Sequence, residues 1–147
     1  MPSSADPYQI RLRGPWQVAW LGSGPPAEEQ PTFDTVYLPE SWKELFGAAP
    51  GRALFRRRFN RPTNLAPDER VVIVLTDVPG EVVLRCNTHE ITAAGASGPQ
   101  QRYDVTEHLR DFNLLEVEIT CDPTAVPQTM AGLWQTVLLE IRPAARL

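Results

Sequence analysis

The chain has 147 residues, of which 42% are hydrophobic and 22% charged, as expected for one globular domain with its own core. Its formal net charge of −4 gives no basic surplus for nucleic acid. The sequence also lacks an apolar run of about 20 residues that could span a membrane and the basic-then-apolar start of a signal peptide. We therefore expect a protein that binds neither nucleic acid nor membranes. It would be cytoplasmic, or secreted if a leader has been removed.

Seven segments predict β-strands, either by strict alternation or by a continuous apolar run. In chain order they are 16–20, 33–38, 53–59, 70–77, 81–87, 114–121 and 136–141. The first places Trp16, Val18 and Trp20 on one face, and we expect both tryptophans in the core. The run at 70–77 is apolar throughout, which is typical of a central strand covered on both sides.

The residues between these segments are typical of loops, with only short helices among them. Most of the 15 prolines fall between the apolar runs. Residues 41–47 could form one or two helical turns. Asp104, followed three residues later by Glu107, predicts a capping box at the start of another short helix. The pattern favours a single all-β domain, an antiparallel β-sandwich or jelly roll.

The sequence offers no catalytic constellation. Cys86 and Cys121 each end an apolar alternating run, and we expect small buried hydrophobic residues rather than a disulfide. His89 and His108 have no partners at metal-ligand spacing, so we expect neither metal nor cofactor. The acidic residues fall in loops or on the outer face of a strand, which favours solvated surface over a carboxylate pair for sugar hydrolysis.

A series of motifs in order along the chain resembles the N-terminal sugar-binding domain of glycoside hydrolase family 2, the β-galactosidase and β-glucuronidase group. These motifs are LRGPWQVAW, VYLPESW, GRALFRRRF, LTDVPGEVVLRCN, YDVTEHL with NLLEVEI, and GLWQTVLLEIRP. The resemblance implies a galactose-binding-domain-like jelly roll over residues 12–143. Residues 1–11 and 144–147 would be tails.

The sequence departs from the family in ways that bear on function. In these enzymes a TIM barrel, which follows the sugar-binding and immunoglobulin-like domains, carries both catalytic glutamates, and no segment here resembles it. In some β-galactosidases a loop of this domain supplies an acidic residue to the active site, but the comparable loop, AAGASGPQQ, has none and places Ala96 there. The family's Asn-Gly turn is Asn87-Thr88. Because threonine is poor at positive φ, we expect another turn geometry in that hairpin.

The resemblance implies a non-catalytic carbohydrate-binding module with a carbohydrate ligand. The alternative is a structural or interaction module that docks onto a partner protein, such as a separately encoded hydrolase subunit. The run of arginines at 56–58 would suit an acidic partner surface, or would simply be a solvated strand face. For Trp134 we favour packing at the corner before the last strand over sugar stacking. The candidate carbohydrate-binding residues are Trp42, Arg57, Arg85, Asn87 and Trp134.

Overall fold

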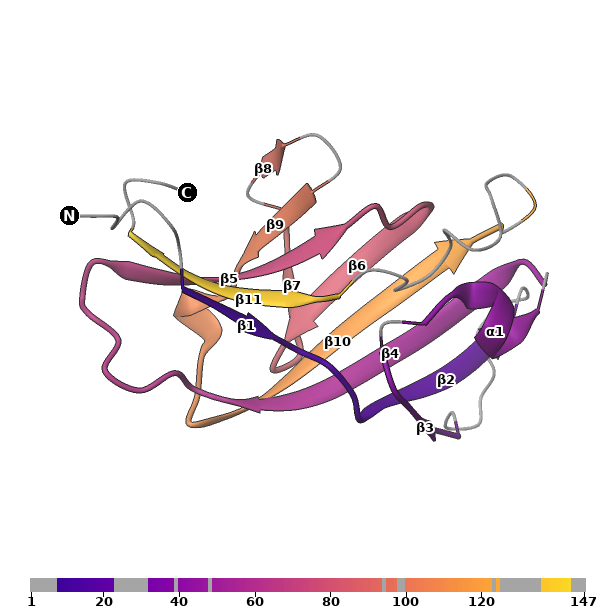
Figure 1. The fold of residues 1–147 in the computed structure, drawn as a ribbon, viewed down its shortest axis with the longest axis horizontal. Helices are drawn as coiled ribbons and strands as arrows, with labels where there is room; N and C mark the ends of the chain where they lie inside the picture. Colours follow the sequence, from indigo (N-terminus) through magenta and orange to yellow (C-terminus); the bar gives the residue numbers. More distant parts are fainter. Residues whose placement is uncertain are drawn as a thin grey trace.

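The chain folds as a sandwich of two antiparallel β-sheets in the computed structural model (Figure 1). The structure describes residues 8–22, 32–38, 40–47, 49–93, 100–122, 124 and 136–143, and the backbone of residues 95–97. The predicted all-β antiparallel sandwich is therefore confirmed. No helix in these described segments is long and apolar enough to cross a membrane.

The five-stranded sheet has the order β1-β11-β5-β9-β8. Its strands are β1 (Tyr8–Arg11), β11 (Leu138–Pro143), β5 (Glu69–Thr76), β9 (Gln100–Asp104) and β8 (Gly95–Ser97). Strand β5 lies at its centre, and all five residues from Val71 to Leu75 are buried. The continuous apolar run thus forms the central strand predicted from it.

The six-stranded sheet has the order β3-β2-β4-β10-β6-β7. Its strands are β3 (Asp34–Val36), β2 (Trp16–Gly22), β4 (Gly51–Asn60), β10 (Phe112–Cys121), β6 (Glu81–Cys86) and β7 (His89–Ile91). Strands β4 and β10 pair over ten positions, from Asn60 with Phe112 to Gly51 with Cys121. In β10, Leu115, Val117 and Ile119 are fully buried, and Glu116 and Glu118 alternate with them on the outer face.

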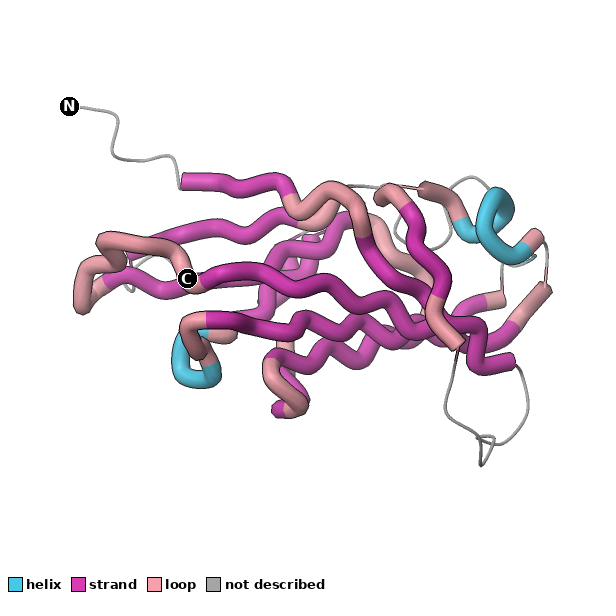
Figure 2. Tube along the Cα trace, turned by 90° about the horizontal axis from the view of Figure 1, so that it is seen from below, coloured by secondary structure: helices cyan, strands magenta, loops and turns pink. Residues whose placement is uncertain are grey.

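Two short helices lie at opposite ends of the sandwich (Figure 2). The helix α1 (Trp42–Phe46) begins after Ser41, whose side chain accepts a hydrogen bond from the Glu44 amide. The 3₁₀ helix η1 (Thr106–His108) follows β9. Both lie within the segments from which short helices were predicted.

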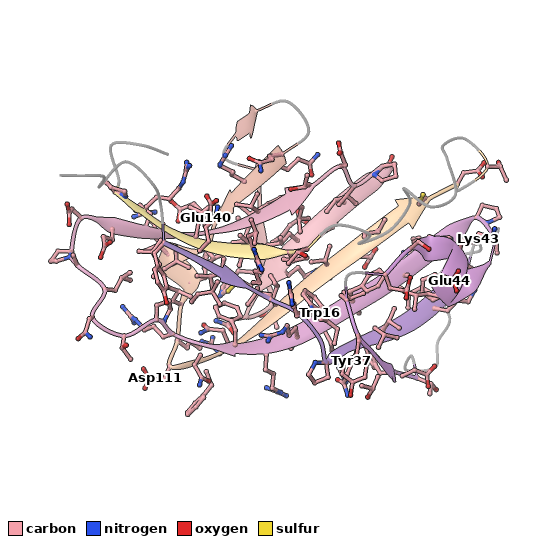
Figure 3. The ribbon with its side chains drawn as sticks, in the orientation of Figure 1. Trp16, Tyr37, Lys43, Glu44, Asp111 and Glu140 are labelled. Carbon is pink, nitrogen blue, oxygen red and sulfur yellow. The ribbon has the colours of Figure 1, made fainter. Side chains whose placement is uncertain are left out.

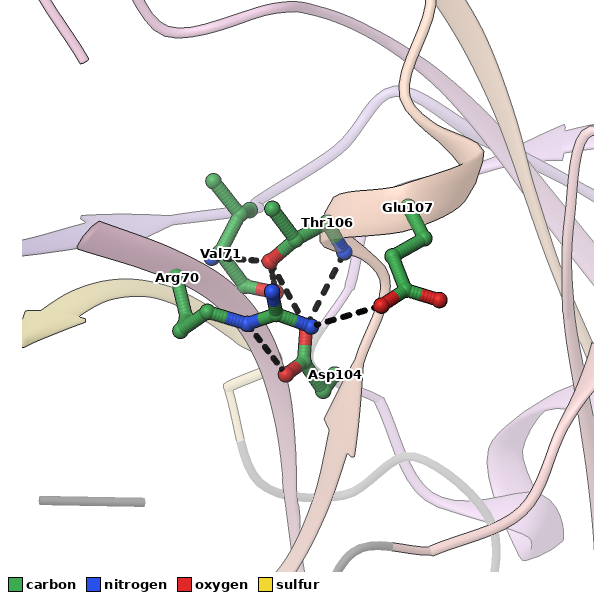
Figure 4. Close-up of polar contacts among 5 residues, drawn as sticks. All are labelled: Arg70, Val71, Asp104, Thr106 and Glu107. Carbon is green, nitrogen blue, oxygen red and sulfur yellow. Dashed lines mark hydrogen bonds and ion pairs between the residues drawn. The ribbon is translucent and has the colours of Figure 1, made fainter. Parts of the chain in front are cut away.

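The capping box predicted for the second helix does not form. Asp104 accepts hydrogen bonds from the amide (3.0 Å) and the hydroxyl (2.6 Å) of Thr106, two residues on, and not from Glu107 (Figure 4). The second oxygen of Asp104 accepts from Arg70 Nε at 2.8 Å. The side chain of Glu107 faces Arg70 at 3.7 Å. The carboxylate of Asp104 therefore ties the end of β9 to the start of β5.

Two further expectations need correction. Residues 8–11, assigned to an N-terminal tail, form β1 and pair with β11, so the domain begins before residue 12. Trp20 is not fully buried: 40% of it is exposed. It lies opposite the inward-facing Ala53, where the register of β2 and β4 shifts, and its ring packs on Trp42 and Phe46 of α1. The predicted face is correct, but the residue sits at the end of the sandwich.

The turn between β6 and β7 also differs from the expectation. Asn87 has φ 53° and Thr88 has φ 72°, so both central residues of this two-residue hairpin are left-handed, as in a type I′ turn. Such turns match the twist of the flanking strands. The side chain of Asn87 is held by hydrogen bonds to the His108 carbonyl, the Asn113 amide oxygen and the Leu114 amide. Tertiary contacts therefore override the preference of Thr88.

Replacing Thr88 with glycine is expected to raise the free energy of unfolding by about 0.5–1 kcal/mol, because glycine adopts positive φ without the steric cost of a β-branched side chain. Urea unfolding of the two proteins measures the difference. Thr88→Ala is the control, since it keeps a Cβ at positive φ and should gain much less. A glycine variant no more stable than the wild type would show that Thr88 is not strained.

Candidate functional site

A pocket of about 430 Å³ opens on the outer face of the six-stranded sheet, where β3, β2, β4 and β10 are neighbours. We call it the arginine pocket. It is lined by Pro15, Trp16, Gln17, Thr35, Arg56, Arg57, Arg58 and Leu114. Three consecutive arginines are therefore among its lining residues.

Strand register explains why these residues meet. Gln17 of β2 lies opposite Thr35 of β3 on one side and Arg56 of β4 on the other. Two residues further along β4, Arg58 lies opposite Leu114 of β10. Because neighbouring strands are about 4.8 Å apart, these side chains from four strands converge on a small area.

The three arginines make different contacts. Arg56 Nε donates to Gln17 Oε1 at 2.7 Å, and its guanidinium lies 3.5 Å above the centre of the Phe33 ring. Arg57 Nε donates to the Arg13 carbonyl at 2.8 Å and Nη1 to the Arg58 carbonyl at 3.0 Å. Partial burial lowers the pKa of Arg57. The exposed side chain of Arg58 makes no hydrogen bond or ion pair with any described residue.

Two exposed aromatic rings flank the pocket. Tyr37 is 71% exposed and lies against Gly14, the residue before Pro15, and Figure 3 shows it near Trp16. Phe112 is 79% exposed and precedes Leu114 by two residues on β10, so it lies on the same face. Accessible rings beside converging amide, hydroxyl and guanidinium groups are features of small-molecule binding sites.

Of the candidates named from the sequence, Arg57 alone lines this pocket among the described residues. Trp42 is fully buried, and its Nε1 donates to the Ala49 carbonyl at 2.9 Å, so its ring offers no face for stacking. Arg85 forms an ion pair with Glu118 at 3.0 Å. Asn87 is buried in the turn described above. Trp134 and the side chain of Ala96 lie outside the described residues.

Sequence reasoning missed Tyr37, Phe112 and Gln17. The arginine run was noted, and alternation placed Arg56 and Arg58 on the face opposite Phe55. What was not predicted is the pairing of β3 with β2 and of β4 with β10, which brings the other residues to the run.

The histidines and cysteines show no sign of a catalytic or metal site. The rings of His89 and His108 stack with centroids 4.5 Å apart, and the described residues contain no group of three or more metal-ligating side chains. Both cysteines are buried and free, as predicted. Burial raises the pKa of the Cys86 thiol to about 11 and also raises that of Cys121, so neither is activated as a nucleophile.

A charged group on the other sheet was also missed. Glu140 is buried on the outer face of the five-stranded sheet, where it accepts from Gln9 Nε2 at 2.6 Å and lies 2.9 Å from Arg142 Nε. Its charge is compensated by neighbouring residues of the same sheet. This group is consistent with a structural ion-pair cluster.

Comparison with solved structures shows the same fold in β-glucuronidases and a putative β-galactosidase. A β-glucuronidase from Bifidobacterium dentium, in complex with coumarin-3-O-glucuronide, matches 97% of this chain with a TM-score of 0.74 and 17% identity. A β-glucuronidase from Faecalibacterium prausnitzii matches 97% with a TM-score of 0.70 and 19% identity. A putative β-galactosidase from Bacteroides fragilis matches 92% with a TM-score of 0.69 and 16% identity.

The matched region is the N-terminal, sugar-binding-like domain of these enzymes. The chain spans 31%, 33% and 23% of their lengths, so the match does not include a catalytic barrel. The sequence matches no protein-family model and no curated protein. The comparison establishes the fold that the motif order implied.

Proposed function

We propose that this chain is a non-catalytic carbohydrate-binding module and that the arginine pocket, with Tyr37 beside it, is its binding site. The observation that carries the proposal is the exposed Tyr37 ring next to a pocket walled by Gln17, Thr35 and arginines. The shared fold with the sugar-binding-like domain of β-glucuronidases and of a putative β-galactosidase supports a sugar as the class of ligand.

The chemistry of the site is that of binding. The Tyr37 ring would pack against the apolar face of a sugar, while the Gln17 amide, the Thr35 hydroxyl and the free guanidinium nitrogens bond its hydroxyls. Glycoside hydrolysis usually needs two carboxyl groups across the scissile bond. No aspartate or glutamate is among the residues that line the pocket, so its described walls provide no acid and base.

Docking onto a partner protein is the second candidate. It is favoured by the same exposed rings, since Tyr37 and Phe112 are typical of surfaces that become covered. A partner would cover both rings together, whereas a monosaccharide would need one of them.

The test is isothermal titration of the protein with a panel of mono- and oligosaccharides. We expect Tyr37→Ala to weaken sugar binding about tenfold or more, since loss of an aromatic anchor costs at least about 1.4 kcal/mol. Its melting temperature should change little because the ring is exposed. Tyr8→Ala is the matched control: Tyr8 is 66% exposed but lies on β1 of the other sheet. Equal affinities of both variants and wild type would refute the assigned site, and absence of any sugar binding would favour the docking role.

A further inference from the structure

The arginines of the pocket differ from most others in the strands. Elsewhere, five strand arginines lie within 4.0 Å of a carboxylate, namely Arg52, Arg70, Arg85, Arg102 and Arg142. None of the three pocket arginines forms an ion pair with a described residue. Their partners are a side-chain amide, a phenyl ring and two backbone carbonyls, all of them neutral.

The nearest acidic residue by strand register does not compensate them. Glu116 of β10 lies opposite Arg56, but it forms no ion pair with Arg56 and does not line the pocket. On the other side of β10, Glu116 lies opposite Arg85, which pairs with Glu118 instead. The positive charges of Arg56 and Arg58 therefore lie on one face of β4 beside the pocket, with no ion pair to a described residue, in a chain whose net charge is −4.

We infer that the arginine pocket selects sugars that carry an anionic group, either the carboxylate of a uronic acid or a sulfate ester. This inference rests on the proposed function. Arg58 is the primary contact, because its planar guanidinium is exposed and free and can bind such a group with two parallel hydrogen bonds. Arg56 lies two residues along β4 on the same face, about 7 Å away, and Phe33 beneath it fixes its orientation.

The partial burial of Arg57 supports this assignment. Burial lowers its pKa, so the surroundings disfavour its charge, and no described carboxylate offsets the effect. An anion bound nearby would stabilise that charge. The neutral hydroxyls of an uncharged sugar would not do so to the same extent.

The test compares glucuronate, galacturonate and glucose 6-sulfate with glucose and galactose by isothermal titration at matched ionic strength. Acetate and inorganic sulfate report binding of an anion without a sugar. We expect an anionic sugar to bind at least about tenfold tighter than its neutral counterpart, with the preference falling as salt rises from about 20 to about 500 mM. The uronate and sulfate arms identify which anionic group is preferred.

Arg58→Gln should reduce affinity for the anionic sugar to that for the neutral one, and Arg58→Lys should retain part of the preference. Arg52→Gln is the matched control, because Arg52 lies on the same strand and face but pairs with Glu118. Equal binding of neutral and anionic sugars would overturn this inference and leave the proposed function standing. Acetate or sulfate binding as tightly as the sugars would overturn it as well. Absence of all sugar binding would overturn the proposed function itself.

Discussion

Replacing Trp42 with alanine is expected to lower the free energy of unfolding by about 3–5 kcal/mol, a large part of the stability of an ordinary domain. Trp42 has no exposed surface, and its ring edge packs on Trp20 and Phe46 with centroids 5.6 and 4.9 Å apart. Truncation would leave a cavity under α1 and remove the donor to the Ala49 carbonyl. Urea unfolding followed by tryptophan fluorescence and circular dichroism measures the loss.

Two variants separate the contributions to this effect. Trp42→Phe keeps most of the aromatic packing and removes the indole hydrogen bond, so it should cost about 1–2 kcal/mol. Trp20→Ala removes a neighbouring ring that is 40% exposed, and it should cost less than Trp42→Ala. Equal losses for Trp20→Ala and Trp42→Ala would mean that α1 is not anchored as described. A stable Trp42→Ala variant with weakened sugar binding would return Trp42 to the list of ligand contacts.

The strands could be predicted because their signal is local. In β10 every second residue from Leu115 to Cys121 is apolar, and each of these is buried. A slip of one residue would move this whole set to the solvent face, so the pattern also constrains the pairing. Three strands gave no such signal to the sequence reading: β1, β8 and β9. Strands β1 and β8 have only four and three residues, and β9 is largely polar.

Features that depend on distant parts of the chain were harder to predict. Thr88 adopts positive φ because Asn87 is fixed by His108, Asn113 and Leu114, which come 20 or more residues later. Trp20 lies on the face that the alternation predicts, but it sits at the end of the sandwich, where 40% of it is exposed. Neither effect is visible in a window of local sequence.

The candidate site shows the same limit. The sequence identified the arginine run but placed Trp42 and Asn87 beside it on the strength of residue type alone. Trp42 packs in the core, and the side chain of Asn87 forms hydrogen bonds in the turn. Tyr37 and Phe112, some 75 positions apart in the chain, flank the pocket only through the order β3-β2-β4-β10. Fold class follows from local periodicity, whereas a binding site follows from register.

The second large effect on the free energy of unfolding is expected at the aspartate–threonine turn after β9. Asp104 accepts three hydrogen bonds, two from Thr106 and one from Arg70, and the Thr106 hydroxyl in turn accepts from the Val71 amide at 2.8 Å. Burial raises the pKa of Asp104, but the bonds from Thr106 and Arg70 outweigh it, so the pKa lies below its usual value. The charged form is therefore the one that the fold stabilises.

Asp104→Asn is accordingly expected to cost about 1.5–3 kcal/mol near neutral pH, as for loss of hydrogen bonds to a partly buried charge, and Asp104→Ala somewhat more. Because the folded-state pKa is below the unfolded one, this contribution is complete above about pH 4 and is lost as the pH falls through the folded-state value. The difference between wild type and Asp104→Asn in urea unfolding should therefore shrink on acidification. Asp122→Asn is the matched control: Asp122 makes the same two contacts with Thr124, but it is exposed and forms no ion pair with a described arginine. Asp122→Asn should lower the free energy of unfolding much less than Asp104→Asn. If the two substitutions cost the same, or if the cost of Asp104→Asn does not change with pH, the ion pair with Arg70 does not stabilise the fold.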